Sequence, residues 1–342
     1  MIPTTRQSSC FLLLIPLALA TLGAAVAAPA ATPEIRLPAR DEITIAFTDS
    51  GLGGLAIMAD AAARFERSGV ARKVHLVFFN ALFSSESGYN SLPSREDQLR
   101  VFSRALDALA RTTRPDLIVI ACNTLSVIYA DTAFARTTSI PVRGIVEPGV
   151  ELLRREWQRN PDATLLLFGT ETTLRENTHR AALIAAGVSA GRIVTQPCPE
   201  LAAYIENNWQ GDDTELMVSS FVDEAAAALP RPPPPVLAGL VCSHYGYAKE
   251  AWQRAFAARG LRLQGLLDPN AILAENLCPP HPTDRPGRTE VTARVLSMVE
   301  IPAARRQSLG SWLQRVSPVV AAALARSGRQ PDLFEWRSAV AK

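Results

Sequence analysis

Short apolar runs alternate with longer amphipathic stretches along most of this chain. The apolar runs predict strands at Ile43–Phe47, Val74–Phe79, Leu117–Ala121, Val142–Val146, Thr164–Phe168, Val194–Gln196 and Leu237–Cys242. Apolar residues spaced three and four positions apart predict helices at Leu55–Arg67, Gln98–Ala110, Pro148–Arg159, Leu174–Ala186 and Tyr247–Arg259. Strands that alternate with helices favour an α/β fold, in which helices cover both faces of parallel sheets.

The C-terminal part continues this pattern after Cys278, with one strand-like patch and two predicted helices, Ala303–Val316 and Pro318–Arg326. The chain has 342 residues, of which 48% are hydrophobic. That length suffices for a leader and two compact domains of about 150 residues each. In open α/β sheets, ligands bind beyond the carboxyl ends of the strands. We therefore expect the functional side chains there.

The first 30 residues have the pattern of a secretory signal peptide. Arg6 precedes the apolar run Phe11–Leu22, and the small residues Ala24–Ala28 follow it. The pattern predicts an exported, periplasmic protein that has no membrane contact once the signal is removed. An uncleaved anchor is the alternative.

Charge and cysteine content narrow the function classes. The formal net charge is +2, and the basic residues are scattered, which disfavours a nucleic-acid partner. Cys10 lies in the leader, and four cysteines remain in a chain long enough to fold without disulfides. No Cys-x-x-Cys or His-x-x-x-His spacing is present, so we expect no metal.

Three segments place polar or reactive side chains directly after predicted strands: Asp49–Leu55, Ala121–Ser126 and Val241–Gly246. The first is a glycine-rich turn, which either binds an anion at a helix N-terminus or is a structural tight turn. The second carries Cys122, which is either an inert buried residue or a thiol activated by the helix field. The third carries Cys242 two residues before His244, a proton-exchanging pair or a core cysteine beside a capping histidine. Such fields lower a thiol pKa from about 8.5 toward about 7.

Together and in this order, the three segments resemble motifs of the aspartate/glutamate racemase superfamily, above all those of glutamate racemase. The family motifs are Asp-Ser-Gly-x-Gly-Gly-Leu, Ala-Cys-Asn-Thr-x-Ser and Gly-Cys-Thr-His-Tyr-Pro. Shorter matches occur at Gly144–Pro148, at Gly169–Thr173, and at Cys198-Pro199 followed by Tyr204-Ile205-Glu206. The resemblance extends from about Ile43 to Asn276.

The resemblance implies two flavodoxin-like, doubly wound parallel-sheet domains related by a pseudo-dyad, with the active site in the cleft between them. The first domain would comprise residues 41–143 and 244–342, and the second residues 144–243. The resemblance also implies that the protein binds a small amino-acid substrate. A homodimer is possible.

The implied activity is that of a cofactor-independent amino-acid racemase, an isomerase that needs no pyridoxal phosphate. Cys122 and Cys242 would exchange the α-proton on opposite faces, one starting as thiolate and the other as thiol. In glutamate racemase the first-domain thiol handles the proton of the D-enantiomer and the second-domain thiol that of the L-enantiomer. Asp49 would support Cys122, whereas His244 and Glu206 would support Cys242. Glu206 also fits an exposed helix carboxylate. The implied substrate-binding residues are Ser50, Gly88, Tyr89, Asn90, Asn123, Thr124, Thr170, Thr173 and Ser243.

The specificity elements depart from the family pattern. The Pro-Tyr-Gly loop corresponds to Gly88-Tyr89-Asn90 within a longer segment, and Glu176 stands where a serine is usual. A carboxylate added near the site would disfavour an acidic substrate side chain. The alternatives are another proton transfer of the superfamily, of the hydantoin racemase or maleate isomerase type, and an exported solute-binding module without turnover.

Five further residues lie outside these motifs or carry no assigned chemistry. Cys198 and Cys278 are interpreted as structural. His75, His179 and His281 are interpreted as surface or packing residues.

Overall fold

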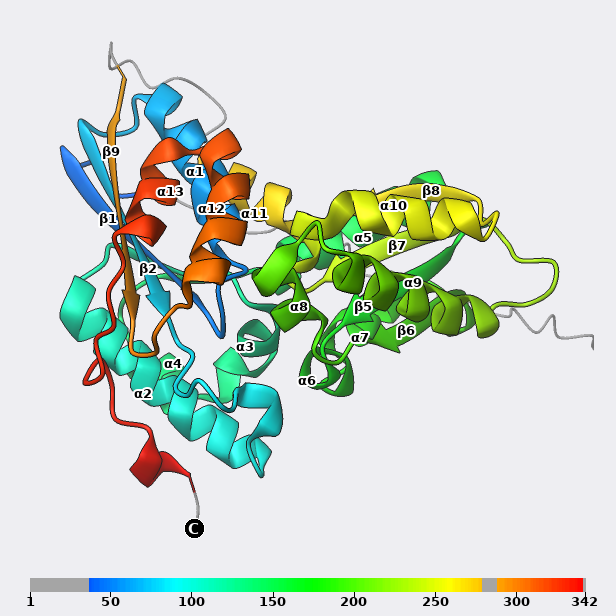
Figure 1. Ribbon diagram of the computed structural model, residues 1–342, viewed down its shortest axis with the longest axis horizontal. Helices are drawn as coiled ribbons and strands as arrows, with labels where there is room; N and C mark the ends of the chain where they lie inside the picture. The colour runs from blue at the N-terminus through cyan, green and yellow to red at the C-terminus, as the bar shows by residue number, and fades with distance from the viewer. Residues whose placement is uncertain (1–36, 279–287, 341–342) are drawn as a thin grey trace, which may run out of the picture. The chain divides into compact units, whose positions relative to one another are not determined.

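Two parallel β-sheets organise the residues that this computed structural model describes, 37–278 and 288–340 (Figure 1). The predicted signal peptide and His281 lie outside the described residues. The first sheet has the order β4-β3-β1-β2-β9, with β1 (Glu42–Asp49), β2 (Lys73–Asn80), β3 (Leu117–Ile120), β4 (Val142–Gly144) and β9 (Glu290–Ser297). The second has the order β6-β5-β7-β8, with β5 (Thr164–Gly169), β6 (Ile193–Pro197), β7 (Val236–Val241) and β8 (Leu263–Leu267).

Helices cover both sheets, as the alternation of strand and helix patterns predicts. They are α1 (Leu55–Ser68), α2 (Arg95–Thr113), α3 (Asn123–Ile128), α4 (Ala133–Thr137), α5 (Val146–Arg159), α6 (Glu171–Arg175), α7 (Thr178–Ala185), α8 (Leu201–Asn208), α9 (Asp212–Ala227), α10 (Lys249–Ala258), α11 (Pro269–Leu277), α12 (Ala303–Val316) and α13 (Pro318–Ala325). The central strands β3, β5 and β7 are buried at every residue, which explains why they are continuous apolar runs.

The two sheets share one topology once β9 is set aside. In each, the first strand along the chain lies between the second and the third, and the fourth lies outside the third. Cys122 follows β3 and Cys242 follows β7, so each cysteine lies within two residues of the end of the third strand of its sheet. The switch in strand order lies between the first and third strands, where open α/β sheets bind ligands.

One hydrophobic cluster joins the two sheets. It contains Phe47 of the first sheet, Phe168 of the second, Trp252 of α10 and Leu309 of α12, all fully buried. Helix α12 packs against both α1 and α8, so the C-terminal part of the chain bridges the two halves. The carboxyl ends of β1, β3, β5 and β7 are thereby held within one compact unit, residues 32–342.

The seven predicted strands and both tail helices are confirmed, but the sheet boundary differs from the prediction. Residues after 243 were expected in the first domain, whereas β8 pairs with β7 in the second sheet. β8 is a half-exposed edge strand interrupted by Gln264 and Gly265, so it lacks the apolar run of a central strand.

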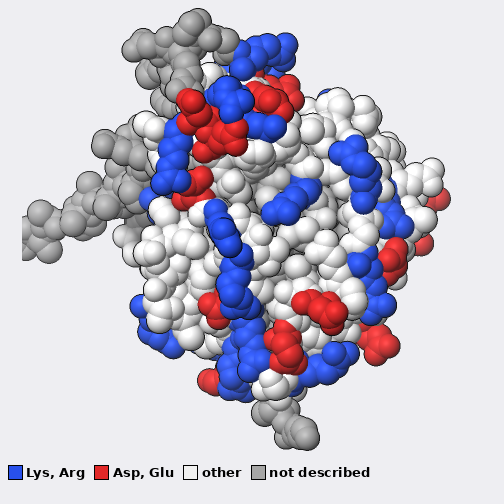
Figure 2. Space-filling model, turned by 90° about the vertical axis from the view of Figure 1, so that its left-hand side faces the viewer, with Lys and Arg blue, Asp and Glu red and all other residues white. Residues whose placement is uncertain are grey.

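The described surface carries both signs of charge. Figure 2 shows Lys and Arg interspersed with Asp and Glu on one face, in keeping with the formal net charge of +2. Among residues 37–278 and 288–340, no helix has the length and hydropathy of a membrane span.

The glycine before α1 sets a testable packing limit. A Cβ on Gly54 would lie 2.6 Å from the Cβ of Ala121, and both positions are fixed by backbone. Gly54→Ala should therefore lower the free energy of unfolding by about 1–3 kcal/mol in urea titration. Gly310→Ala is the control, because Gly310 lies within α12 with no atom near its Cβ position. It should raise stability by about 0.5–1 kcal/mol; equal stability of both variants would contradict this packing.

Candidate active site

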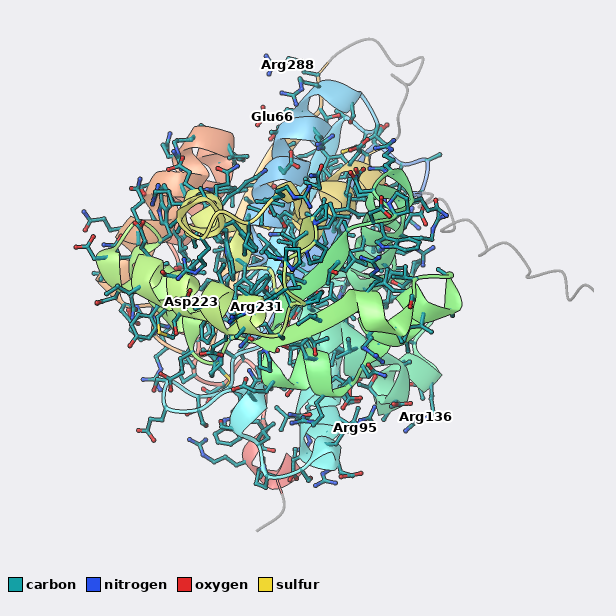
Figure 3. All side chains as sticks on the ribbon, turned by 90° about the vertical axis from the view of Figure 1, so that its right-hand side faces the viewer. Glu66, Arg95, Arg136, Asp223, Arg231 and Arg288 are labelled. Atoms are coloured by element: carbon teal, nitrogen blue, oxygen red, sulfur yellow. The ribbon has the colours of Figure 1, made fainter. Side chains whose placement is uncertain are left out.

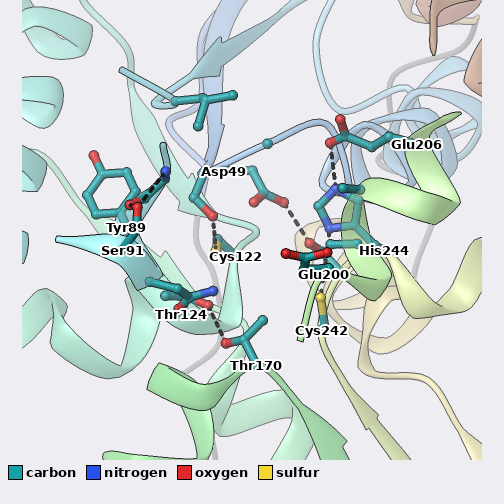
Figure 4. A pocket seen from close by; sticks show the side chains of 18 of the residues that line it. Asp49, Tyr89, Ser91, Cys122, Thr124, Thr170, Glu200, Glu206, Cys242 and His244 are labelled. Carbon is teal, nitrogen blue, oxygen red and sulfur yellow. Dashed lines mark hydrogen bonds and ion pairs between the residues drawn. The ribbon is translucent and has the colours of Figure 1, made fainter. Parts of the chain in front are cut away.

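A cavity of about 670 Å³ lies at the carboxyl ends of the strands of both sheets (Figure 4). The segments that follow β1, β3, β5 and β7 all contribute to its wall. The predicted catalytic residues Asp49, Cys122, Glu206, Cys242 and His244 all line it. So do Ser50, Gly88, Tyr89, Asn90, Asn123, Thr124, Thr170 and Ser243. The chain thus brings together residues that are up to about 190 positions apart in sequence, as the 194-residue separation of Asp49 and Ser243 illustrates.

Thr173 is the one predicted substrate residue that is not part of the cavity wall. Its hydroxyl lies 3.0 Å from that of Thr170 and 3.3 Å from that of Thr124. Thr124 and Thr170, which come from different sheets, are themselves 2.8 Å apart. Thr173 therefore holds the two wall hydroxyls in place from behind.

Cys122 begins α3 at the end of β3, and its side chain is buried. Its Sγ lies 3.2 Å from the Oγ of Ser50. Burial, and next the negative charge of Asp49, raise the pKa of Cys122 well above its usual value. The expectation of a lowered thiol pKa is wrong for this residue, because loss of water outweighs the field of a short helix. Cys122 is a neutral thiol at neutral pH.

Cys242 is the first member of a buried chain of polar groups (Figure 4). Its Sγ lies 3.8 Å from Nδ1 of His244, whose Nε2 lies 2.8 Å from Oε1 of Glu206. Burial alone would lower the pKa of His244, but Cys242 and Glu206 together raise it well above its usual value. Burial would raise the pKa of Glu206, but His244 and Arg305 hold it below its usual value. The pair is an imidazolium and a carboxylate.

Glu206 is 5% exposed, so its alternative reading as an exposed helix carboxylate is wrong. Besides His244, it accepts hydrogen bonds from the backbone N–H of Leu52 at 2.8 Å and from Arg305 Nη1 at 2.9 Å. The glycine-rich turn therefore does bind an anion, and that anion is the carboxylate of Glu206. A Cβ on Gly51 would lie 2.9 Å from Oε1 of Glu206, which explains the absence of a side chain there.

Asp49 lies at the end of β1 and joins the two halves from the opposite side of the same turn. Its Oδ2 accepts hydrogen bonds of 2.7 Å from the N–H of Gly54 and from the hydroxyl of Ser243. Neither of these hydrogen bonds involves Cys122. Asp49 affects that thiol through its negative charge, which raises the pKa of Cys122. Ser50, not Asp49, is the direct contact of Cys122.

Asn123 has hydrogen-bonding capacity that the described chain does not use. It is 2% exposed, lines the cavity, and neither its Oδ1 nor its Nδ2 has a partner among the described residues. Leaving a buried amide unpaired is unfavourable by about 1–3 kcal/mol. The amide is therefore placed to bind polar groups of a ligand.

The cavity wall also contains residues to which the motifs assign no role, among them Arg305, Glu200 and Cys198. Arg305 comes from α12, beyond the matched segments, and no local pattern points to the site. Cys198, interpreted as structural, lies beside Pro199 in the segment that precedes α8. Only the position of Cys198 in a segment that matches the family could have indicated that it lines the cavity.

Glu176 does not line the cavity, contrary to the expectation of a carboxylate near the substrate. Both its oxygens lie 3.1 Å from Nε of Arg95, whose Nη2 contacts Asp131. Arg95 lies toward the lower part of the face in Figure 3. Glu176 is thus neutralised in an ion-pair network outside the site.

His75, His179 and Cys278 lie outside the cavity wall. His179 is buried, and burial lowers its pKa to about 4, as expected for a neutral packing residue. Within the described ranges, no group of three His, Cys, Asp or Glu side chains is arranged to hold a metal ion. The cavity wall contains three thiols, those of Cys122, Cys198 and Cys242, together with hydroxyl and amide side chains.

The sequence profile of the Asp/Glu/Hydantoin racemase family matches residues 67–232. The glutamate racemase of Lactiplantibacillus plantarum is 29% identical over 168 residues, which cover 49% of this chain and 56% of that protein. The glutamate racemase of Aquifex pyrophilus is 24% identical over 207 residues, covering 60% of this chain and 72% of that protein. The chain thus spans a little over half the length of the first of these relatives.

Solved structures of glutamate racemases share the fold. The Francisella tularensis enzyme in complex with D-glutamate has a TM-score of 0.58 and 19% identity, covering 81% of this chain and 95% of that one. The Escherichia coli enzyme in complex with L-glutamate and UDP-MurNAc-ala has a TM-score of 0.57 and 20% identity, covering 81% and 96%. At this identity the likeness concerns the arrangement of the two α/β halves.

The hydrogen bond from Arg305 to Glu206 is testable by stability. Arg305→Gln should lower the free energy of unfolding at pH 7 by about 1–3 kcal/mol, because a buried carboxylate loses a charged donor. The pKa of Glu206 lies below its ordinary 4.5. The stability that depends on its charge is therefore present above pH 4.5 and is lost as the pH falls through the folded-state pKa. The difference from the native chain should shrink in acid.

Arg306→Gln is a matched control for this experiment. Arg306 is the next residue of α12, has the same 27% side-chain exposure, and pairs with Glu300, which is 59% exposed. Urea unfolding of both variants from pH 7 to pH 3 measures the effect. An equal loss of unfolding free energy in the two variants at pH 7 would mean that Arg305 and Glu206 form an ordinary surface ion pair.

Proposed function

We propose that this chain, which belongs to the Asp/Glu racemase superfamily, is a cofactor-independent amino-acid racemase. The observation that carries the proposal is the placement of two buried thiols. Cys122 and Cys242 follow equivalent strands of two sheets and line one cavity. A racemase without a cofactor needs such a pair, since a single base returns the proton to the face from which it came.

The two thiols differ in their surroundings, which suits opposite roles in one turnover. The positively charged His244 lies 3.8 Å from Sγ of Cys242, whereas burial and the negative charge of Asp49 raise the pKa of Cys122. The Cys242 thiolate takes the α-proton from one face, and the electron pair left on the carbon is delocalised into the carboxylate. Cys122 then gives its proton to the opposite face, so that Cys242 ends as thiol and Cys122 as thiolate.

The intermediate needs donors for the charge that develops on its carboxylate oxygens. Asn123 supplies an unpaired buried amide, and the hydroxyls of Thr124, Thr170 and Ser243 line the same cavity. Donors already held in place gain strength in a site shielded from water. By resemblance, Cys242 would act on the L-enantiomer and Cys122 on the D-enantiomer.

Export is a separate proposal, which rests on the sequence of the first 30 residues alone. An exported racemase would act on amino acids outside the cytoplasm, such as those of wall turnover. Expression of the full chain followed by periplasmic extraction and N-terminal sequencing tests this. Release with a new N-terminus near Ala28–Ala31 supports export, and an intact N-terminus in the cytosolic fraction contradicts it.

The role of the thiols is tested by turnover under reducing conditions in D₂O with single-enantiomer amino acids. We expect inversion with α-deuteration for the native chain, and at least about a 10²-fold loss of inversion in Cys122→Ser and in Cys242→Ser. Each variant should still deuterate one enantiomer, because one base remains. Polarimetry and NMR measure the two outcomes.

Cys278→Ser is the control, since Cys278 lies outside the cavity and burial raises its pKa to about 12. It should retain native turnover. Unchanged inversion in either cavity variant would contradict the two-base assignment. Binding without α-deuteration for every amino acid would instead favour the solute-binding module.

A further inference from the structure

The charges around the cavity are strongly unequal. Five carboxylates line it, those of Asp49, Glu86, Glu171, Glu200 and Glu206. Only two of the lining residues can carry a positive charge, His244 and Arg305. A cavity lined mainly by one sign of charge concentrates ligands of the opposite sign.

Both cations are already engaged by one carboxylate. His244 and Arg305 contact different oxygens of Glu206, at 2.8 and 2.9 Å. Arg305 also donates to Oδ1 of Asn207 at 2.8 Å. No free cation therefore remains in the described wall to receive an acidic substrate side chain.

The three outer carboxylates have no such partners. Glu86, Glu171 and Glu200 are exposed, and none makes an ion pair with a described residue. Figure 4 shows the carboxylate of Glu200 on the side of the cavity that holds Cys242 and His244. Its backbone has a φ of 59°, a conformation uncommon for glutamate.

The carboxylates line the same cavity as a buried amide that has no partner among the described residues. Asn123 is 2% exposed and presents an unpaired amide to the same cavity. At about 670 Å³, the cavity falls in the range of 300–1,000 Å³ that accommodates drug-sized ligands. There is room for a side chain longer than that of glutamate.

We propose that the substrate is a basic amino acid, whose cationic side chain is held by Glu200 with Glu86 and Glu171 around it. This inference rests on the proposed racemase function and specifies its substrate class. A primary ammonium or a guanidinium group at the end of the side chain both fit, so lysine, ornithine and arginine are the candidates. The reaction type is that of the glutamate racemases to which the chain is similar. Glu200 is the residue to which we assign the preference for a cationic side chain.

The test compares kcat/KM for charged and neutral side chains of matched shape. The pairs are L-arginine with L-citrulline and L-lysine with L-norleucine, and L-glutamate is added as the acidic case. We expect each basic amino acid to exceed its neutral partner by about tenfold or more, as one favourable charge contact of about 1.4 kcal/mol gives. Glutamate should be the poorest substrate.

Variants assign the preference to Glu200. Glu200→Gln should lower kcat/KM for arginine about tenfold and leave citrulline within about twofold. Glu200→Lys should reverse the order of arginine and glutamate. Glu250→Gln removes the same charge from α10, where the side chain is 74% exposed, and should change neither ratio. Glu250 is not part of the cavity wall.

Binding separates the failure of this inference from the failure of the proposed function. Calorimetry with arginine and citrulline measures selectivity whether or not turnover occurs. Preferred binding of arginine that is lost in Glu200→Gln supports the inference even if no α-deuteration is seen, which would overturn only the racemase. A preference for glutamate, or equal losses for arginine and citrulline in Glu200→Gln, would overturn the inference.

Discussion

The candidate site depends on one buried carboxylate that both halves of the fold share. Glu206 belongs to α8, yet it accepts hydrogen bonds from the turn after β1, from His244 after β7 and from Arg305 of α12. A charge buried to this extent is stable only when donors surround it. Each donor comes from a different part of the chain, so the cavity, the imidazolium and the C-terminal helix form as one arrangement.

This arrangement gives the two thiols different electrostatic surroundings within the same cavity. Cys242 lies beside a cation, whereas Cys122 lies near the negative charge of Asp49 and in contact with the Ser50 hydroxyl. A symmetric fold has thereby produced an asymmetric pair, which is what one proton donor and one proton acceptor require. Asp49 also connects the halves, because it accepts a hydrogen bond from Gly54 in its own turn and another from Ser243 after β7.

Much of the fold was predictable because central parallel strands are continuous apolar runs and their carboxyl ends carry the motifs. β8 was not predicted because it is a partly exposed edge strand. Its glutamine and glycine interrupt the apolar run that marks the central strands. The motifs located Cys122 and Cys242, but not the thiol environment, which follows from burial. Arg305 lies 99 positions from Glu206 in the sequence, and only the packing of α12 on α8 brings them together. Glu176 shows the converse: its carboxylate lies near a motif but turns to Arg95.

In the proposed reaction, different sulfurs remove and return the proton on opposite faces of one carbon. Its most direct measurement follows deuterium in both enantiomers at early times in D₂O, starting from one pure enantiomer under reducing conditions. We expect the product to carry deuterium at the α-carbon while the remaining substrate carries none. Equal deuteration of substrate and product from the first turnovers would mean that a single base serves both faces, and would contradict it.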